Sequence, residues 1–137
     1  MRQRIEYRRT RDLPMDQVVG LYRANGWSSA EKPEQLMAAL VGSDCVVSAL
    51  EGEMLVGLGN AISDGHLVVY YPHLIVHPDY QRCGIGAALA REFVASYKGF
   101  HQHVLVADGD AIEFYRKLGF TRAGRTESMW IYAGADH

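Results

Sequence analysis

The chain has 137 residues, 48% of them hydrophobic, which is enough apolar material to build one core without disulfides or metals. Its formal net charge of −2 gives no general attraction to nucleic acid. Two cysteines, Cys45 and Cys83, are too few for a disulfide framework, and the sequence contains no signal peptide or long apolar run. We therefore expect a cytoplasmic protein in which residues 1–137 form one domain.

Apolar spacing and turn residues predict the elements of the first third of the chain. Residues 3–9 alternate between apolar and charged side chains, which is typical of a strand with one solvated face. The arginines crowded into the first eleven residues favour an edge strand with a charged face over a nucleic-acid-binding arm. Two helices are expected next, one between Pro14 and Gly26 and one from Pro33 to Gly42.

A meander of three strands is expected after these helices, because two glycine-containing turns separate three apolar runs. The remaining elements alternate between helices and strands. In chain order the expected elements are strands at Cys45 to Leu50, Met54 to Ile62 and His66 to Val76, a helix from Gly84 to about Tyr97, a strand at Val104 to Val106, a helix between Asp108 and Gly119, and two short strands near Phe120 and at Met129 to Tyr132.

The stretch from Val76 to Leu89 carries the clearest functional signal. An apolar strand runs there into a polar loop and then into a helix whose first turn contains Gly84 and Gly86. The first N–H groups of a helix have no intrahelical partner, and the helix dipole adds partial positive charge at the same place. Glycine lets a phosphate approach these amides closely, so the pattern predicts an anion site.

The two glycines have two other interpretations. A dinucleotide fingerprint also contains G-x-G, and Asp108 follows at roughly the spacing of a ribose-binding acid. Leu89 stands in place of the third glycine, however, and a seven-residue loop from His77 to Cys83 separates the strand from the glycines. The other alternative is a turn that only connects strand to helix.

A second motif, from Asp108 to Phe120, favours a particular family. Its apolar residues Ala111, Phe114, Tyr115 and Leu118 recur at helical spacing, and Gly119 provides a C-terminal cap. Together with Gln81-x-x-Gly84-x-Gly86, about twenty residues earlier, this pattern resembles the GNAT superfamily of acetyl-CoA-dependent N-acetyltransferases. The resemblance is strong from Leu74 to Phe120 and weak before Asp44. Asp108 departs from it, because the family has asparagine at this position.

The resemblance implies an α+β fold with a central, mostly antiparallel mixed sheet of six to seven strands and helices on both faces. In that fold the strands ending at Val76 and beginning at Val104 are parallel and splay apart, and pantetheine pairs with the exposed edge. By position, the residues expected to contact acetyl-CoA are Leu74, Ile75, Val76, Gln81, Arg82, Cys83, Gly84, Ile85, Gly86, Ala87, Asp108 and Ala111.

The resemblance also implies an acetyl transfer by direct attack of a primary amine on the thioester. The two positions where family members carry a base hold Tyr70 and Pro72. His73 lies one residue beyond the second of these positions, so in a regular strand its side chain would point to the opposite face. A bulge in the strand would return it to the face expected for the base. The candidates for the base are therefore His73, Asp108 or a water chain ending at either, with Glu113 on the outer helical face as a weaker one. Tyr115 is expected to donate a hydrogen bond to the leaving sulfur.

The acceptor is expected to be a small cationic amine, with a peptide amine still open. Trp27, Tyr70 and Tyr71 are the candidate aromatic contacts, and carboxylates at Asp64, Asp108 and Asp110 would favour a cation. His101 and His103 lack further ligands at metal spacing, so no metal is expected. No nucleic acid or membrane partner is expected either. A homodimer remains open, as does a non-catalytic acyl-CoA-binding sensor or partner module on the same fold.

Overall fold

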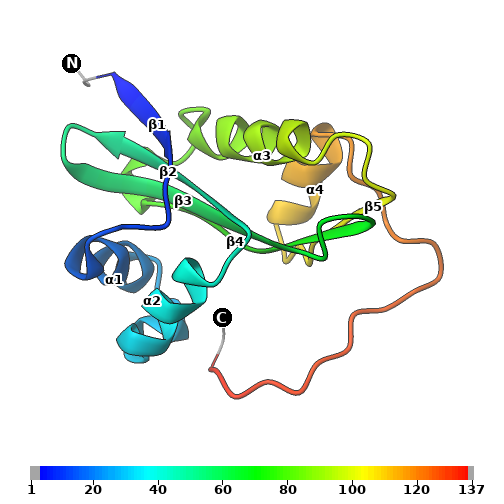
Figure 1. Ribbon diagram of the computed structural model, residues 1–137, viewed down its shortest axis with the longest axis horizontal. Coiled ribbons are helices and arrows are strands. Elements are labelled where there is room, and N and C mark those ends of the chain that lie inside the picture. Colours follow the sequence, from blue (N-terminus) through cyan, green and yellow to red (C-terminus); the bar gives the residue numbers. More distant parts are fainter. Residues whose placement is uncertain (1–3, 136–137) are drawn as a thin grey trace.

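A mixed sheet runs through the middle of the protein and carries helices on both faces (Figure 1). The computed structural model describes residues 4–135. Figure 1 shows α1 and α2 below the sheet and α3 and α4 above it. The elements are β1 (Ile5–Arg9), α1 (Met15–Ala24), η1 (Ser28–Glu31), α2 (Pro33–Val41), β2 (Cys45–Glu51), β3 (Met54–Ser63), β4 (Val68–Val76), η2 (Pro78–Tyr80), α3 (Ile85–Ser96), β5 (Gln102–Val104) and α4 (Ala111–Lys117).

The strand order of the sheet is β1-β2-β3-β4-β5. The first four strands pair antiparallel with their neighbours, and β4 pairs parallel with β5. The α+β class and the parallel pair at one end agree with the sequence-based expectation. The expected charged edge strand is also found, because β1 is the first strand of the sheet and four of its five residues are exposed.

Side chains on the two faces of the sheet belong to two separate hydrophobic cores. The core beneath α1 and α2 includes Val18, Tyr22, Leu40, Leu58 and Ile75. The core beneath α3 includes Val56, Val69, Ile85, Leu89 and Phe93. Since β3 contributes side chains to both cores, seven consecutive residues of it are buried, as expected for a strand covered on both faces.

Glycines in β3 let α3 lie close to the sheet. A Cβ on Gly59 would lie 2.5 Å from Cε2 of Phe93 and 3.1 Å from Cδ1 of Leu74. A Cβ on Gly57 would lie 2.9 Å from Cγ2 of Ile85. These glycines therefore set the spacing between the sheet and the helix that begins at the predicted anion site.

An irregularity in β4 changes which face its side chains occupy. Asn60 pairs with His73 and Ile62 pairs with Tyr70, so two residues of β4 stand opposite one residue of β3. Before this bulge Val69 contributes to the α3 core, whereas after it Ile75 contributes to the α1 and α2 core. The structure thereby confirms the bulge that would place the His73 side chain on the face expected for the base.

The expectation of six to seven strands is wrong for the described residues, in which the sheet has five. The strands expected near Phe120 and at Met129 to Tyr132 are not formed, since the chain after α4 contains no regular element through Ala135. Within residues 4–135 this segment pairs with no strand, although the outer edge of β5 is also unpaired.

Two strand boundaries also differ from the expectation. The Asp64 carboxylate accepts the N–H groups of His66, Leu67 and Val68, which holds the first two of these residues in the turn, so β4 begins at Val68. Pairing of β5 with β4 ends at Val104, whereas the expected strand began there. No helix among the described residues is long and apolar enough to cross a membrane.

We predict that Gly59→Ala lowers the free energy of unfolding by about 1–3 kcal/mol, because the new Cβ overlaps the Phe93 ring. Gly20→Ala is the matched control, since nothing lies within 4 Å of a Cβ at this position of α1. The control should be neutral or stabilise the protein by up to about 1 kcal/mol. Urea denaturation measures both, and equal midpoints for Gly59→Ala and the parent chain would contradict the packing described.

Candidate active site

A cavity opens between β4 and the helices above it, and both residues with an expected catalytic role line it. Tyr71, His73 and Leu74 of β4 form one wall. Ala90 and Phe93 of α3 and Tyr115 of α4 form another, and Leu105 and Phe120 complete the lining. Apart from His73 and the two tyrosines, the lining is apolar.

His73 is held from three directions. Its backbone N–H donates to Oδ1 of the buried Asn60 at 3.1 Å, across the bulge. Its Nδ1 lies 2.9 Å from the hydroxyl of Tyr22, which is fully buried in α1. Trp27 also contacts the imidazole, with ring centroids 5.3 Å apart. The orientation of the imidazole is thus fixed by groups from β3, α1 and the segment after α1.

Burial raises the pKa of Tyr22 above its usual range, so this phenol stays neutral at any physiological pH. The neutral hydroxyl can either donate to Nδ1 of His73 or accept a hydrogen bond from it. If Nδ1 carries the proton and donates to the Tyr22 oxygen, Nε2 is the nitrogen able to accept a proton. The Tyr22 contact therefore governs which tautomer His73 adopts.

Tyr115 is positioned by aromatic neighbours on both sides. Its ring centroid lies 5.0 Å from that of Phe114 and 5.7 Å from that of Phe120. The Phe120 N–H donates to the Tyr115 carbonyl at 3.1 Å, which closes the end of α4. Burial raises the pKa of Tyr115 to about 12, so its hydroxyl is a hydrogen-bond donor rather than a phenolate at neutral pH.

The backbone of β4 beyond the bulge is paired on one side only. β5 pairs with Val68, Val69 and Tyr70 and then stops. The His77 N–H donates to the Val56 carbonyl of β3. In an antiparallel pair the backbone groups of successive residues point alternately toward and away from the neighbouring strand. The backbone groups of Ile75 therefore point toward β3, and those of Leu74 and Val76 point away from it. The expected splay is present, and two of the three residues expected to bind pantetheine there face the gap.

The loop from His77 to Gly84, here called the anion loop because an anion site is predicted there, leads into α3. Gly84 caps the helix with φ of +85°, and Arg82 is a non-glycine residue at φ of +64°. Ala88 is the first residue of α3 whose N–H reaches back to the carbonyl of Gly84. The N–H groups of Ile85, Gly86 and Ala87 therefore point out of the helix end, as the sequence pattern predicted.

Gly86 has a second role that its sequence position did not reveal. A Cβ there would lie 3.2 Å from Cζ of Phe114 and 3.7 Å from Cγ2 of Val76. The close approach of α4 to the start of α3 therefore depends on this glycine. Gly86 couples the anion loop to the helix that carries Tyr115.

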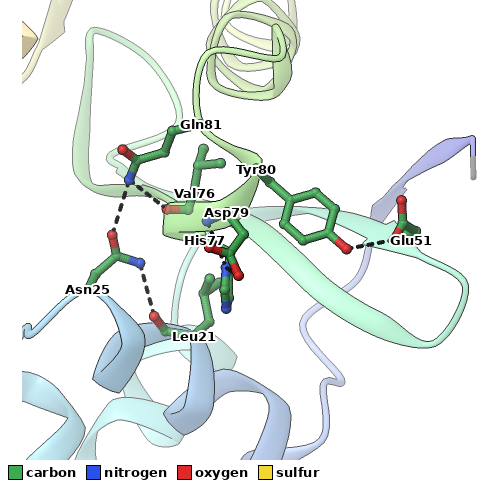
Figure 2. A network of polar contacts seen from close by, with 8 residues as sticks. All are labelled: Leu21, Asn25, Glu51, Val76, His77, Asp79, Tyr80 and Gln81. Atoms are coloured by element: carbon green, nitrogen blue, oxygen red, sulfur yellow. Dashed lines mark hydrogen bonds and ion pairs between the residues drawn. The ribbon is translucent and has the colours of Figure 1, made fainter. Parts of the chain in front are cut away.

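Polar side chains hold the loop against the rest of the protein (Figure 2). Gln81 donates through Nε2 to the Val76 carbonyl at 3.1 Å and to Oδ1 of Asn25 at 3.4 Å. Asn25 in turn donates to the Leu21 carbonyl of α1. On the other side of the loop, the Tyr80 hydroxyl donates to Glu51 at the end of β2.

The remaining predicted residues lie in different settings. Tyr70 is exposed, whereas Tyr71 is buried in the α3 core and its hydroxyl lies 2.8 Å from Nδ1 of His103. Trp27 is half-buried beside His73. Tyr71 therefore faces the cavity with Tyr115, whereas Trp27 and His73 meet on the α1 side of β4.

Of the predicted acidic residues, Asp108 and Asp110 are exposed just before α4. The Asp108 carbonyl accepts the N–H of the half-buried Ala111. The three backbone hydrogen bonds of Asp64 lower the pKa of its carboxyl group, and they occupy it in its own turn. Cys83 is exposed in the anion loop.

Sequence reasoning missed Tyr22 and Asn60, which both contact His73. Nothing in the sequence indicated that Tyr22 has a partner across the sheet. Asn60 carried a usable signal, because it is the one polar side chain in the apolar run from Met54 to Ile62. A buried amide in such a strand must find hydrogen-bond partners, and here they are Ser43 and His73.

Among residues 4–135 no group of three or more histidine, cysteine, aspartate or glutamate side chains is placed to hold a metal ion.

Comparison with known proteins identifies the family. Residues 42–122, more than half of the chain, match the family model described as an acetyltransferase (GNAT) domain. An uncharacterized N-acetyltransferase of Porphyra purpurea is 27% identical over 120 residues, which cover 82% of this chain and 68% of that protein. A histone acetyltransferase of Glycine max is 28% identical, and the match covers 69% of this chain and 46% of that protein.

Solved structures agree with this result. A GNAT-family acetyltransferase from Streptococcus pneumoniae TIGR4 is similar, with a TM-score of 0.82 and 32% identity, covering 95% of this chain and 99% of that one. An aminoglycoside N-acetyltransferase in complex with CoA shares the fold, with a TM-score of 0.69 and 16% identity over 94% of this chain and 93% of that one. The chain belongs to the GNAT family of acetyltransferases.

We predict that Gly86→Asp weakens acetyl-CoA binding at least about 30-fold, because a carboxylate would oppose the pyrophosphate at the helix end. Gly86→Ala is the matched control, since it adds the same Cβ against Phe114 without the charge. Calorimetric titration with acetyl-CoA on both folded variants separates the two effects. Equal affinity for Gly86→Asp and Gly86→Ala would mean that the phosphates bind elsewhere.

Proposed function

We propose that the protein transfers the acetyl group of acetyl-CoA to a small cationic primary amine by direct attack in a ternary complex. The observation that carries this proposal is the cavity lined by both His73 and Tyr115, next to the unpaired edge of β4. The free cysteines Cys45 and Cys83 suit a reducing compartment, and we place the enzyme in the cytoplasm.

The cosubstrate would be held by backbone groups at two places. Its pyrophosphate would accept the N–H groups at the start of α3, where the loop conformation of Arg82 and Gly84 directs them outward. Its pantetheine amides would pair with Leu74 and Val76 along the edge of β4. The Gln81 amide that now donates to the Val76 carbonyl would have to give up this bond, and Arg82, Cys83, Asp108 and Ala111 remain expected contacts.

The amine must lose a proton before it attacks the thioester. An alkyl amine with a pKa of about 10.4 is neutral in roughly one molecule in 2,500 at pH 7, which corresponds to about 4.6 kcal/mol. Among the residues that line the cavity, His73 carries the side chain suited to a general base, and its imidazole lies on the α1 side of β4. We assign this role to its Nε2, with Nδ1 donating to the Tyr22 oxygen 2.9 Å away.

Tyr115 would stabilise the departing thiolate without giving up its proton. With its pKa raised to about 12, full transfer to a thiolate of pKa about 8.5 would cost roughly 5 kcal/mol. Donation of a hydrogen bond avoids this cost and strengthens as negative charge develops on sulfur. The apolar neighbours Phe114 and Phe120 pack against the Tyr115 ring, and a low local dielectric would increase the effect.

The acceptor would approach from the side of β4 where Trp27 contacts His73. Tyr70, which is exposed on the same strand, would add a second aromatic face. Each face attracts an ammonium group by about 0.5–2 kcal/mol. Tyr71 is buried on the other side of the strand, so we assign it to the acetyl-binding wall.

A non-catalytic acyl-CoA-binding module is the second candidate. It is favoured by the cavity lining, which includes no carboxylate, and by the Tyr22 hydroxyl, which can donate to Nδ1 of His73 and leave Nε2 protonated. Release of free thiol from acetyl-CoA in the presence of polyamines, arylalkylamines, amino acids and lysine peptides distinguishes the candidates. Turnover with a cationic amine supports the proposed enzyme, whereas tight binding without turnover supports the module.

We predict that Tyr115→Phe lowers kcat roughly 10- to 1,000-fold while the affinity for acetyl-CoA changes little, because the hydroxyl acts on charge that develops in the transition state. Phe120→Leu is a control for packing around the Tyr115 ring, since it perturbs the neighbour and keeps the hydroxyl. Steady-state kinetics and calorimetry together test this role. An effect on KM alone would assign Tyr115 to binding.

We also predict that kcat/KM rises with pH along a limb between about pH 6 and 7.5, where histidine ordinarily loses its proton. The limb should vanish in His73→Ala. Tyr22→Phe should keep the limb and shift its midpoint, because it removes the hydroxyl and leaves the imidazole in place. A single limb above about pH 9, unchanged in His73→Ala, would instead report titration of the free amine and exclude His73 as the base.

A further inference from the structure

Three apolar side chains from three neighbouring strands lie side by side on the sheet. Tyr70 of β4 pairs with Ile62 of β3 and with Val104 of β5, and residues paired in this way point to the same face. Neighbouring strands are about 4.8 Å apart, so the three side chains form a row about 10 Å long. The row of Ile62, Tyr70 and Val104 is here called the apolar strip.

The apolar strip lies on the face of the sheet that carries α1 and α2. Val69 and Tyr71 flank Tyr70 in β4, and both belong to the α3 core, so the Tyr70 side chain points to the opposite face. In β5, His103 contacts the Tyr71 hydroxyl and therefore lies on the α3 face. Its neighbour Val104 consequently points to the same face as Tyr70.

The strip is exposed and adjoins the candidate base. Ile62 is 52% exposed and Tyr70 is 40% exposed, and α1 and α2 lie toward the end of the sheet away from β5 (Figure 1). Three residues after Tyr70, the bulge brings His73 to this same face, where Trp27 contacts the imidazole. Apolar surface therefore continues from the proposed acceptor side of His73 across three strands.

No charged side chain belongs to the strip, and the two carboxylates that adjoin this end of β3 have other partners. Asp64 follows β3 directly, and its carboxylate accepts three backbone N–H groups of its own turn. Asp44 donates its N–H to the Ala61 carbonyl, and its carboxylate accepts the Tyr97 hydroxyl. An ammonium group placed over the strip would lose water of hydration there and gain no dedicated ion pair.

We propose that the apolar strip binds the hydrocarbon body of the acceptor, which is a monoamine with an alkyl or aryl chain and not a polyamine. The inference rests on the proposed acetyl transfer and adds the substrate class to it. The amine nitrogen would lie at His73, and the chain would extend over Tyr70 toward Ile62 and Val104. The strip offers contact area to carbon and no ion pair to a second ammonium group, so it distinguishes the two kinds of amine.

Two amines of equal length test the inference. Hexylamine carries a methyl group where cadaverine carries its second ammonium group, and the two chains are otherwise alike. Release of free thiol from acetyl-CoA at a series of amine concentrations gives kcat/KM for each. We expect the value for hexylamine to exceed that for cadaverine at least about 30-fold, and each methylene added from ethylamine to hexylamine to raise it about 2- to 4-fold.

Ile62→Glu tests the strip itself, because it places a carboxylate where the second ammonium group of cadaverine would lie. We expect the preference for hexylamine over cadaverine to fall at least about 10-fold, with the affinity for acetyl-CoA unchanged by calorimetry. Met54→Glu is the matched control, since Met54 is 40% exposed at the opposite end of the same strand. This control should keep the preference of the parent chain.

The outcomes separate this inference from the proposed function. No thiol release with any amine would overturn the proposed function and this inference with it. Equal acetylation of cadaverine and hexylamine, or an unchanged preference in Ile62→Glu, would overturn the inference and leave the acetyl transfer standing. A change in the mass of Ile62→Glu in solution, with the amine preference unchanged, would show that a protein covers the strip and would overturn the inference as well.

Discussion

The bulge in β4 is the irregularity on which the rest of the site depends. Because two residues there oppose one residue of β3, His73 faces α1 and meets Tyr22 and Trp27. Pairing with β5 stops at Tyr70, immediately before the bulge, and Pro72 has no N–H with which to continue a ladder. One local change therefore orients the candidate base and opens the edge along which a pantetheine chain can pair.

The candidate site includes residues from both faces of the sheet. His73 is held from the α1 side, whereas Tyr115 belongs to α4, which lies on the α3 side of the sheet (Figure 1). Gly86 connects the anion loop to this helix through its contact with Phe114, and Gln81 connects the same loop to α1 through Asn25. The loop is thus packed against α4 on one side and bonded to α1 on the other.

The two edge strands of the sheet, β1 and β5, differ in their charged side chains. Charged residues on β1 limit pairing with other chains, whereas β5 carries no acidic residue, lysine or arginine. The segment from Met129 to Tyr132 is exposed and, among residues 4–135, pairs with neither edge of the sheet.

The sequence by itself predicted the helices and strands from Ile5 to Lys117, with different bounds for β4 and β5 and without the short helices η1 and η2. It also placed Gly84 and Gly86 at the start of a helix and Tyr115 within one, because these features depend on local spacing, caps and turn residues. The sequence indicated the bulge in β4 indirectly, because His73 lies on the face expected for the base only if the strand contains a bulge. Tertiary structure alone decided that Tyr22 and Asn60 hold His73, that Gly86 contacts Phe114, and that the segment from Met129 to Tyr132 forms no strand with its own sheet. Each of these outcomes depends on a contact between residues distant in sequence, and periodicity within one segment shows which face is buried but not what covers it.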